Sequence, residues 1–122
     1  METVGISTTA KLDDSSWAAL GRAVRRLEEA WQNGSTVEFD TLLPPSCNPI
    51  RDRVLIELIK VDQEFRWRRG EQRFLETYLR EWPELGDSDA ARVELLGAEC
   101  LTRAMFEKLP RSEELQARFP SL

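Results

Sequence analysis

The second half of the chain contains a segment that recurs after 37 residues. The shift aligns Leu58 with Leu95, Asp62 with Glu99, Arg66 with Arg103 and Glu76 with Glu113. An aromatic residue, a proline, a variable residue and a leucine close both copies, at residues 82–85 and 119–122. A fainter copy, shifted by 36 residues, aligns Trp31 with Trp67. Because a unit of long helix, turn and short helix cannot bury its apolar face alone, we expect the units to be stabilised by stacking.

Helical periodicity also runs through the rest of the chain. One apolar face, with residues spaced three and four apart, consists of Trp17, Leu20, Val24, Leu27 and Trp31. Capping residues and prolines predict later helices after Asn48 and Pro49, over residues 74–82, from residues 87–89 onward, and after Pro110. No segment alternates with period two for long enough to predict a strand. The sequence therefore predicts an all-α fold.

The expected architecture is a compact bundle of about three repeat units with short capped turns. A flexible N-terminal tail, residues 1–12, precedes a single helical domain, residues 13–122, with units at approximately residues 15–45, 48–85 and 87–122. Gly21 and Gly97 lie inside predicted helices, where glycine costs ~1 kcal/mol relative to alanine. These two glycines therefore predict close helix crossings.

The residue types present exclude several classes of function. The chain of 122 residues contains no histidine, which removes the commonest general base and the commonest metal ligand. Cys47 and Cys100 are not part of a CxxC pair, so neither a zinc site nor a disulfide is predicted. The sequence also lacks a glycine-rich phosphate loop. We therefore expect no cofactor and no metal.

Charge and hydropathy restrict the partners and the location. The net charge of −5 disfavours nucleic acid and anionic lipid as partners. The sequence has no apolar run of the ~18 residues that a membrane span needs. The first residues lack the pattern of a secretory signal. The expectation is a cytoplasmic protein without a membrane partner.

Two carboxylates recur at the same position of the repeat, each four residues before an arginine. Asp62 precedes Arg66 and Glu99 precedes Arg103, and this acid-first spacing places opposite charges one helical turn apart. Paired carboxylates could serve as general acid and base, but an active site is needed once, whereas these pairs recur. We therefore interpret both as structural ion pairs and predict that the chain is not an enzyme.

Arginine and tryptophan gather in residues 66–73. Such a cluster can hold a phosphate backbone and stack on bases, but acidic residues flank it, and arginine is also favoured at helix C-termini. Trp67 lies off the main apolar face of its helix, so it either packs between repeat units or contacts a partner. Together with Arg68 and Arg69 it forms the candidate partner contact.

Residues 55–85 resemble a segment that lies ahead of the catalytic domain in large bacterial serine/threonine protein kinases of the planctomycete type. The residues that carry the resemblance are Leu58, Val61, Asp62, Glu64, Arg66, Gly70, Glu71, Glu76, Tyr78, Leu79, Pro83 and Leu85. The closing residues 118–122 are similar to the second terminator of that family. The resemblance extends over residues 17–122.

This resemblance implies a non-catalytic helical region associated with kinase signalling. The sequence contains neither the His-Arg-Asp of a kinase catalytic loop nor a glycine-rich nucleotide loop. We therefore expect a protein–protein interaction or regulatory module whose partner is a serine/threonine kinase in cis or in trans. The alternative is a transcription-linked nucleic-acid-binding domain that uses the arginine-rich helix end. A third hypothesis is a hydrolase that uses Asp62 and Glu99.

Overall fold

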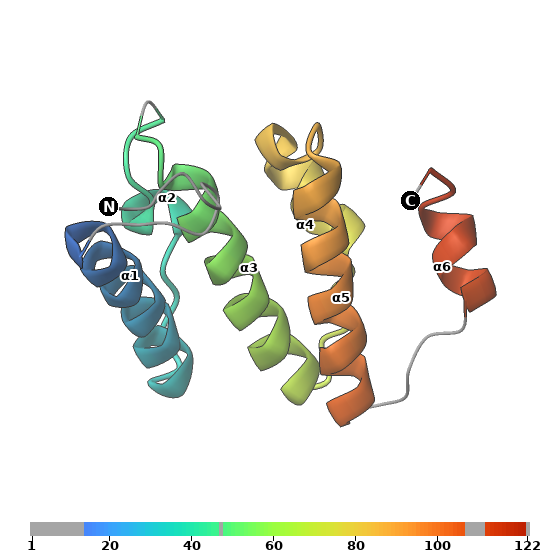
Figure 1. Ribbon diagram of the computed structural model, residues 1–122. Coiled ribbons are helices and arrows are strands. Elements are labelled where there is room, and N and C mark those ends of the chain that lie inside the picture. Colours follow the sequence, from blue (N-terminus) through green and yellow to red (C-terminus); the bar gives the residue numbers. More distant parts are fainter. Residues whose placement is uncertain (1–13, 47, 107–111, 122) are drawn as a thin grey trace. The chain divides into compact units, whose positions relative to one another are not determined.

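The computed structural model describes residues 14–46, 48–106 and 112–121, and the regular structure within these ranges is entirely helical (Figure 1). The elements are α1 (Asp14–Gln32), α2 (Phe39–Leu42), α3 (Arg51–Arg68), α4 (Leu75–Glu81), the 3-10 helix η1 (Pro83–Leu85), α5 (Asp89–Phe106) and α6 (Ser112–Arg118). The all-α class is confirmed. The predicted tail, residues 1–12, lies outside the described residues.

The chain divides into two compact units, Met1–Val54 and Leu55–Leu122. In the first unit, α1 buries one face, formed by Leu20, Ala23 and Leu27. Trp17 is 50% exposed, so the expectation that it belongs to this buried face is wrong. It lies in the first turn of α1, one turn before the buried face begins.

Local signals in the sequence explain where the long helices begin and end. The backbone N–H of Ile50 donates to Asn48 Oδ1 at 3.0 Å, as expected for a cap before α3. Gly70, with φ of +87°, follows the end of α3. Its backbone N–H donates to the Trp67 carbonyl at 3.0 Å and the next N–H donates to the Arg66 carbonyl at 2.8 Å. These two bonds satisfy the last carbonyls of the helix, and glycine is favoured there because the left-handed conformation is strained for other residues.

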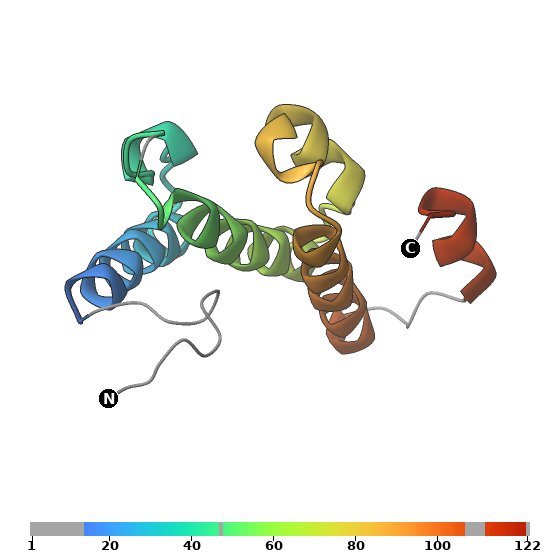
Figure 2. The same ribbon diagram turned by 45° about the horizontal axis from the view of Figure 1, so that its top comes forward.

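In the second unit, α3 and α5 run in the same direction at an angle to each other, and α4 contacts both (Figures 1 and 2). Residues of α3 contact residues of α5 in the same order along both helices, as Lys60 with Glu94, Gln63 with Glu99 and Arg68 with Phe106. The core of the unit consists of fully buried side chains: Leu55, Leu58, Ile59, Leu75, Tyr78, Leu85 and Leu95. α6 stands on the side of α5 that faces away from α3.

The repeat is visible in the lengths and burial of these helices. α4 and α6 each have seven residues and begin 37 residues apart. Leu58 and Leu95 are both 0% exposed, and the aligned acids Asp62 and Glu99 are both buried. Helices α3 and α4 fall within residues 48–85, and α5 and α6 fall within residues 87–122.

The two helical glycines do not mark close helix crossings. A Cβ atom placed at Gly21 or at Gly97 would meet no atom within 4 Å. The prediction of close crossings at these positions is therefore wrong, because no neighbouring helix reaches either glycine.

Across the described ranges, none of the helices combines the length and the apolar character that crossing a membrane requires.

Candidate functional site

The predicted ion pair in the first copy of the repeat is present and lies on α3. Arg66 Nε donates to Asp62 Oδ2 at 2.7 Å, and the Tyr78 hydroxyl of α4 donates to the same oxygen at 2.6 Å. Arg66 also reaches Glu71 at 2.8 Å. Asp62 is buried, so these hydrogen bonds replace the water that its charge would otherwise need. The pair therefore ties the end of α3 to α4.

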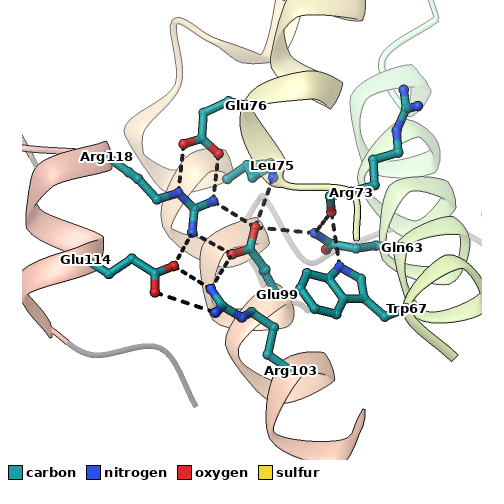
Figure 3. A network of polar contacts seen from close by, with 9 residues as sticks. All are labelled: Gln63, Trp67, Arg73, Leu75, Glu76, Glu99, Arg103, Glu114 and Arg118. Atoms are coloured by element: carbon teal, nitrogen blue, oxygen red, sulfur yellow. Dashed lines mark hydrogen bonds and ion pairs between the residues drawn. The ribbon is translucent and has the colours of Figure 1, made fainter. Parts of the chain in front are cut away.

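The second carboxylate, Glu99 on α5, is 0% exposed and lies at the centre of a larger network (Figure 3). Glu99 Oε1 accepts a hydrogen bond from the Leu75 backbone N–H at 2.9 Å and from Gln63 Nε2 at 3.4 Å. Arg118 of α6 donates to both of its oxygens, at 2.7 and 2.9 Å. One side chain thus contacts α3, α4 and α6, and it satisfies a backbone donor in the first turn of α4.

Two arginines complete this network. Arg118 also donates to both oxygens of Glu76 on α4, at 2.6 and 2.7 Å. The predicted pair of Arg103 with Glu99 has a separation of 3.7 Å, and the shorter contact of Arg103 is with Glu114 at 2.5 Å. Three glutamates therefore share two arginines, and the planar guanidinium groups bridge three helices.

The same contacts shift the pKa values of the groups involved. The hydrogen bond from Arg118 lowers the pKa of Glu76, and the hydrogen bond from Arg103 lowers the pKa of Glu114. The pKa of Arg118 is raised, chiefly by its hydrogen bond to Glu76. Burial, followed by the charge of Asp62, raises the pKa of Tyr78 far above its ordinary value. Each shift favours the protonation state that keeps the network intact.

Trp67, the first residue of the candidate partner contact, is buried. Its indole N–H donates to the Arg73 carbonyl at 3.1 Å, and its ring meets the ring of Phe74 edge to face at 5.7 Å. The guanidinium of Arg103, from α5, lies over the Trp67 ring at 5.5 Å. Of the two alternatives for Trp67, this geometry fits packing between the repeat units.

Arg68 and Arg69, the other two candidate contact residues, are exposed at the end of α3. Arg68 donates to Glu64 at 2.9 Å, and its guanidinium lies over the rings of Phe65 and Phe106 at 5.0 and 5.6 Å. Arg73, at the other end of the arginine-rich segment, pairs with Glu81 at 2.5 Å. Acidic partners therefore offset much of the positive charge that a phosphate backbone would require.

The geometry of the two aligned acids bears on the hydrolase hypothesis. Asp62 and Glu99 are both buried, and their oxygens accept hydrogen bonds from arginine, tyrosine, glutamine and backbone donors. A general acid or base must reach a substrate atom, and these carboxylates face other parts of the chain. Within the described ranges no three His, Cys, Asp or Glu side chains gather into a potential metal site.

A groove of about 410 Å³ lies between α5 and α6. Its walls carry no charged side chain and consist of Val93, Leu96, Gly97, Cys100, Ser112, Leu115, Gln116 and Phe119. Val93 is 56% exposed, and Gly97, Ser112 and Gln116 are also exposed, so the groove is open to solvent. An apolar, solvent-accessible hollow of this size is typical of a binding site.

The thiol of Cys100 lies in this groove and has no disulfide partner among the described residues. Burial, followed by the charge of the adjacent Glu99, raises its pKa above the ordinary value. A raised pKa reduces the thiolate fraction at neutral pH, and thiolate is the reactive form. Cys100 is thus a poorly activated nucleophile. Cys47 lies outside the described residues.

The sequence identifies the two acids but not most of their partners. Arg118 and Glu76 are 42 residues apart, and sequence analysis noted them only as parts of a terminator and of the repeat. Gln63 and the Leu75 N–H carry no pattern that identifies them as partners of Glu99. A groove between stacked helix pairs is what a repeat module predicts, but its lining residues were not identified, although Gly97 and Cys100 are two small residues on one face of α5.

Comparison of the chain with family models, with curated proteins and with solved structures finds no match.

Proposed function

We propose that this chain is a non-catalytic helical module that binds a protein partner in serine/threonine kinase signalling, in the cytoplasm. The observation that carries the proposal is the open apolar groove between α5 and α6. Exposed apolar surface is costly for an isolated domain, and contiguous patches of it commonly mark sites of association. The free thiol of Cys100 suits a reducing compartment.

The polar network supports a structural role for the charged residues. Glu99, Arg103 and Arg118 contact one another and the neighbouring helices. They contribute to the fold, so they do not provide a solvated cluster for chemistry. This arrangement favours a binding module over the hydrolase that uses Asp62 and Glu99.

The link to kinases rests on the resemblance of residues 55–85 to the region ahead of bacterial kinase catalytic domains. Asp62, Arg66 and Tyr78, three residues of that resemblance, form one cluster in the structure. A pattern whose members contact one another is a packing pattern, which suits a helical module. The kinase itself would lie elsewhere in the same protein or on another chain.

Affinity capture with variants of the groove tests this function. The full chain, Val93→Arg and Leu101→Arg are used as baits in a lysate of the cells that express the protein, and bound proteins are identified by mass spectrometry. Both residues lie on α5 and are exposed, at 56% and 71%, but only Val93 lines the groove. We expect a serine/threonine kinase to be captured by the full chain and by Leu101→Arg, and to be lost with Val93→Arg.

A second pair of measurements separates the module from a nucleic-acid-binding domain. The double variant Arg68→Glu, Arg69→Glu is expected to retain the kinase and to show the same dependence on salt as the full chain. Capture of nucleic acid that weakens steeply with salt and disappears in this double variant would contradict the proposal. Capture without any kinase, or capture that is insensitive to Val93→Arg, would contradict it as well.

A further inference from the structure

One row of aligned positions, which we call the stripe, is buried on α3 and largely exposed on α5. On α3 the stripe is buried, with Ile56, Ile59, Gln63 and Trp67 exposed by 5%, 0%, 1% and 5%. The aligned residues of α5 are Val93, Leu96, Cys100 and Ala104, of which Val93 and Ala104 are exposed and the other two half-buried. These positions are three and four residues apart, so they lie on one face of each helix. The two helices differ in burial on this face, whereas the aligned leucines Leu58 and Leu95 do not.

The stripe on α3 is covered by α5 together with Arg73 and Phe74, the residues just before α4. Lys60, on the same face, donates to Glu94 at 2.6 Å, and Gln63 donates to Glu99 at 3.4 Å. Trp67 lies beneath the guanidinium of Arg103, at 5.5 Å. A parallel helix therefore closes this face of the first helix pair. No described residue closes the corresponding face of α5.

The short helices show the same contrast. On α4, Leu75 and Tyr78 are 0% and 1% exposed. Their aligned residues on α6, Ser112 and Leu115, line the open groove. The groove is therefore the second copy of a surface that is interior in the first copy, and what it lacks is a helix in the place of α5.

We propose that the groove binds an amphipathic α-helix of a partner protein, oriented parallel to α5, as α5 is oriented relative to α3. This inference rests on the proposed function and specifies the partner's chemistry. The bound helix would present alanine and leucine four residues apart, because Ala91 and Leu95 are the apolar residues on the buried side of α5. Gly97 replaces Lys60 at the centre of the groove, and a Cβ atom there would meet nothing within 4 Å. A partner helix can thus approach α5 closely at Gly97, and it needs no charged residue opposite this position.

A second copy of this chain does not supply the occupant, because its α5 is not available. Ala91 and Leu95, with Glu99, are 6%, 0% and 0% exposed, so a second copy could present this face only by unfolding. The uncharged lining of the groove also gives an anionic membrane surface or nucleic acid nothing to bind by charge. A helix with an apolar stripe is the partner that the lining fits.

A fusion tests whether the groove accepts such a helix. A second copy of residues 86–106, with its own Cys100→Ser and with Glu99→Gln because the groove has no charged lining, is attached after Leu122 through a Gly/Ser linker of 20 residues, which spans about 25 Å. The host chain carries Cys47→Ser, so Cys100 in the groove is its only thiol. Reaction of this thiol with a disulfide reagent is followed at pH 8. We expect about tenfold protection, the value for a helix with a Kd of about 0.1 mM held at about 1 mM effective concentration.

The control fusion carries Leu95→Asp in the attached copy only and is expected to give no protection. Circular dichroism confirms that the host remains folded in both fusions. Equal thiol reactivity in the fusion and in the unfused chain would overturn the inference, and so would equal protection by the control. Sedimentation of the unfused chain is the third measurement. Dimerisation that Val93→Arg abolishes and Leu101→Arg does not would also overturn the inference, because the occupant would then be a second copy.

These outcomes are distinguishable from failure of the proposed function. If the kinase is captured through Val93 but the fused helix does not protect Cys100, the groove binds a segment that is not an α5-like helix. If the helix protects Cys100 but no kinase is captured, the groove is a helix-binding site and the signalling role is wrong.

Discussion

Helices α3 and α4 form a pair whose inner face is closed, whereas α5 and α6 form a pair whose equivalent face is open. Where α3 carries the large or polar residues Lys60, Gln63 and Trp67, α5 carries Gly97, Cys100 and Ala104. The larger residues occur where a neighbouring helix supplies hydrogen bonds and ring contacts. The smaller residues occur where the surface meets solvent. Shared residues therefore form the interior of each pair, and the residues that differ between the copies are those that face a neighbouring helix in one pair and solvent in the other.

The largest expected effect on stability comes from replacing the two aligned acids, Asp62 and Glu99. Glu99→Gln should lower the free energy of unfolding by about 3 to 5 kcal/mol, because it removes the fully buried charge that pairs with Arg118 and Arg103 at the centre of the network. Asp62→Asn should cost only about 1 to 3 kcal/mol, since Arg66 is less buried and keeps Glu71. Urea denaturation measures both.

The exposed acid Glu113, on α6, provides the control for these variants. Glu113→Gln should change the free energy of unfolding by less than about 0.5 kcal/mol. Equal losses for Glu99→Gln and Asp62→Asn would show that the two copies of the repeat rely on their acids to the same extent, contrary to the difference in their contacts.

The next test compares one apolar position in the two copies. Ile59 is 0% exposed, so Ile59→Ala should cost about 2 to 5 kcal/mol through lost burial and the cavity that remains. Leu96, aligned with Ile59, lines the open groove, so Leu96→Ala should cost less than about 1.5 kcal/mol. Thermal or urea unfolding gives both values. A Leu96→Ala loss as large as that of Ile59→Ala would mean that the groove is closed in solution.

A smaller effect is expected at the centre of the groove. Gly97→Ala should raise the free energy of unfolding by about 1 kcal/mol or less, since alanine is the better helix former and space for its methyl group is free. Gly70→Ala is the matched control and should be destabilising because Gly70 has a φ of +87°. A loss of stability in Gly97→Ala, measured by urea denaturation, would indicate that something packs against this residue.

The smallest effect is the dependence of stability on pH. Glu76 and Glu114 have pKa values below the ordinary value of 4.5 in the folded chain, so the folded state resists their protonation. The stability that they contribute is present above pH 4.5 and declines as the pH falls through their lowered pKa values. Partial exposure of both carboxylates screens the effect. Melting temperatures between pH 7 and pH 3 measure it, and Arg118→Gln should reduce the part of the acid slope that comes from Glu76. An unchanged slope in that variant would show that Arg118 is not the cause.

Local patterns made most of the fold predictable from the sequence. The cap at Asn48, the terminator at Gly70 and the apolar spacing over α3 act within a few residues, so they can be read directly. The same holds for the ion pair of Asp62 with Arg66, which lies within one helical turn.

Contacts between distant segments could not be predicted in this way. The pairing of Arg118 with Glu76 depends on how α6 packs against α4. A single ion pair between residues 42 positions apart produces no periodic pattern in the sequence, so it cannot be recognised there. The alignment of Glu99 with Asp62 predicted a similar ion pair with Arg103, but the stronger partners of Glu99 come from α6 and α4. The groove depends on which side of α5 remains uncovered, and a helical stripe alone does not reveal its neighbours.

The hydrogen bond from the Leu75 N–H to Glu99 joins residues 24 positions apart. α4 has only seven residues, too few to hold a helix in water without outside contacts. During synthesis on the ribosome, residues 75–81 would therefore remain disordered until α5 has been synthesised, because the first turn of α4 needs Glu99 as a hydrogen-bond acceptor. A nascent chain arrested before Glu99 should remain open to proteases at residues 71–81, and one arrested after α5 should not.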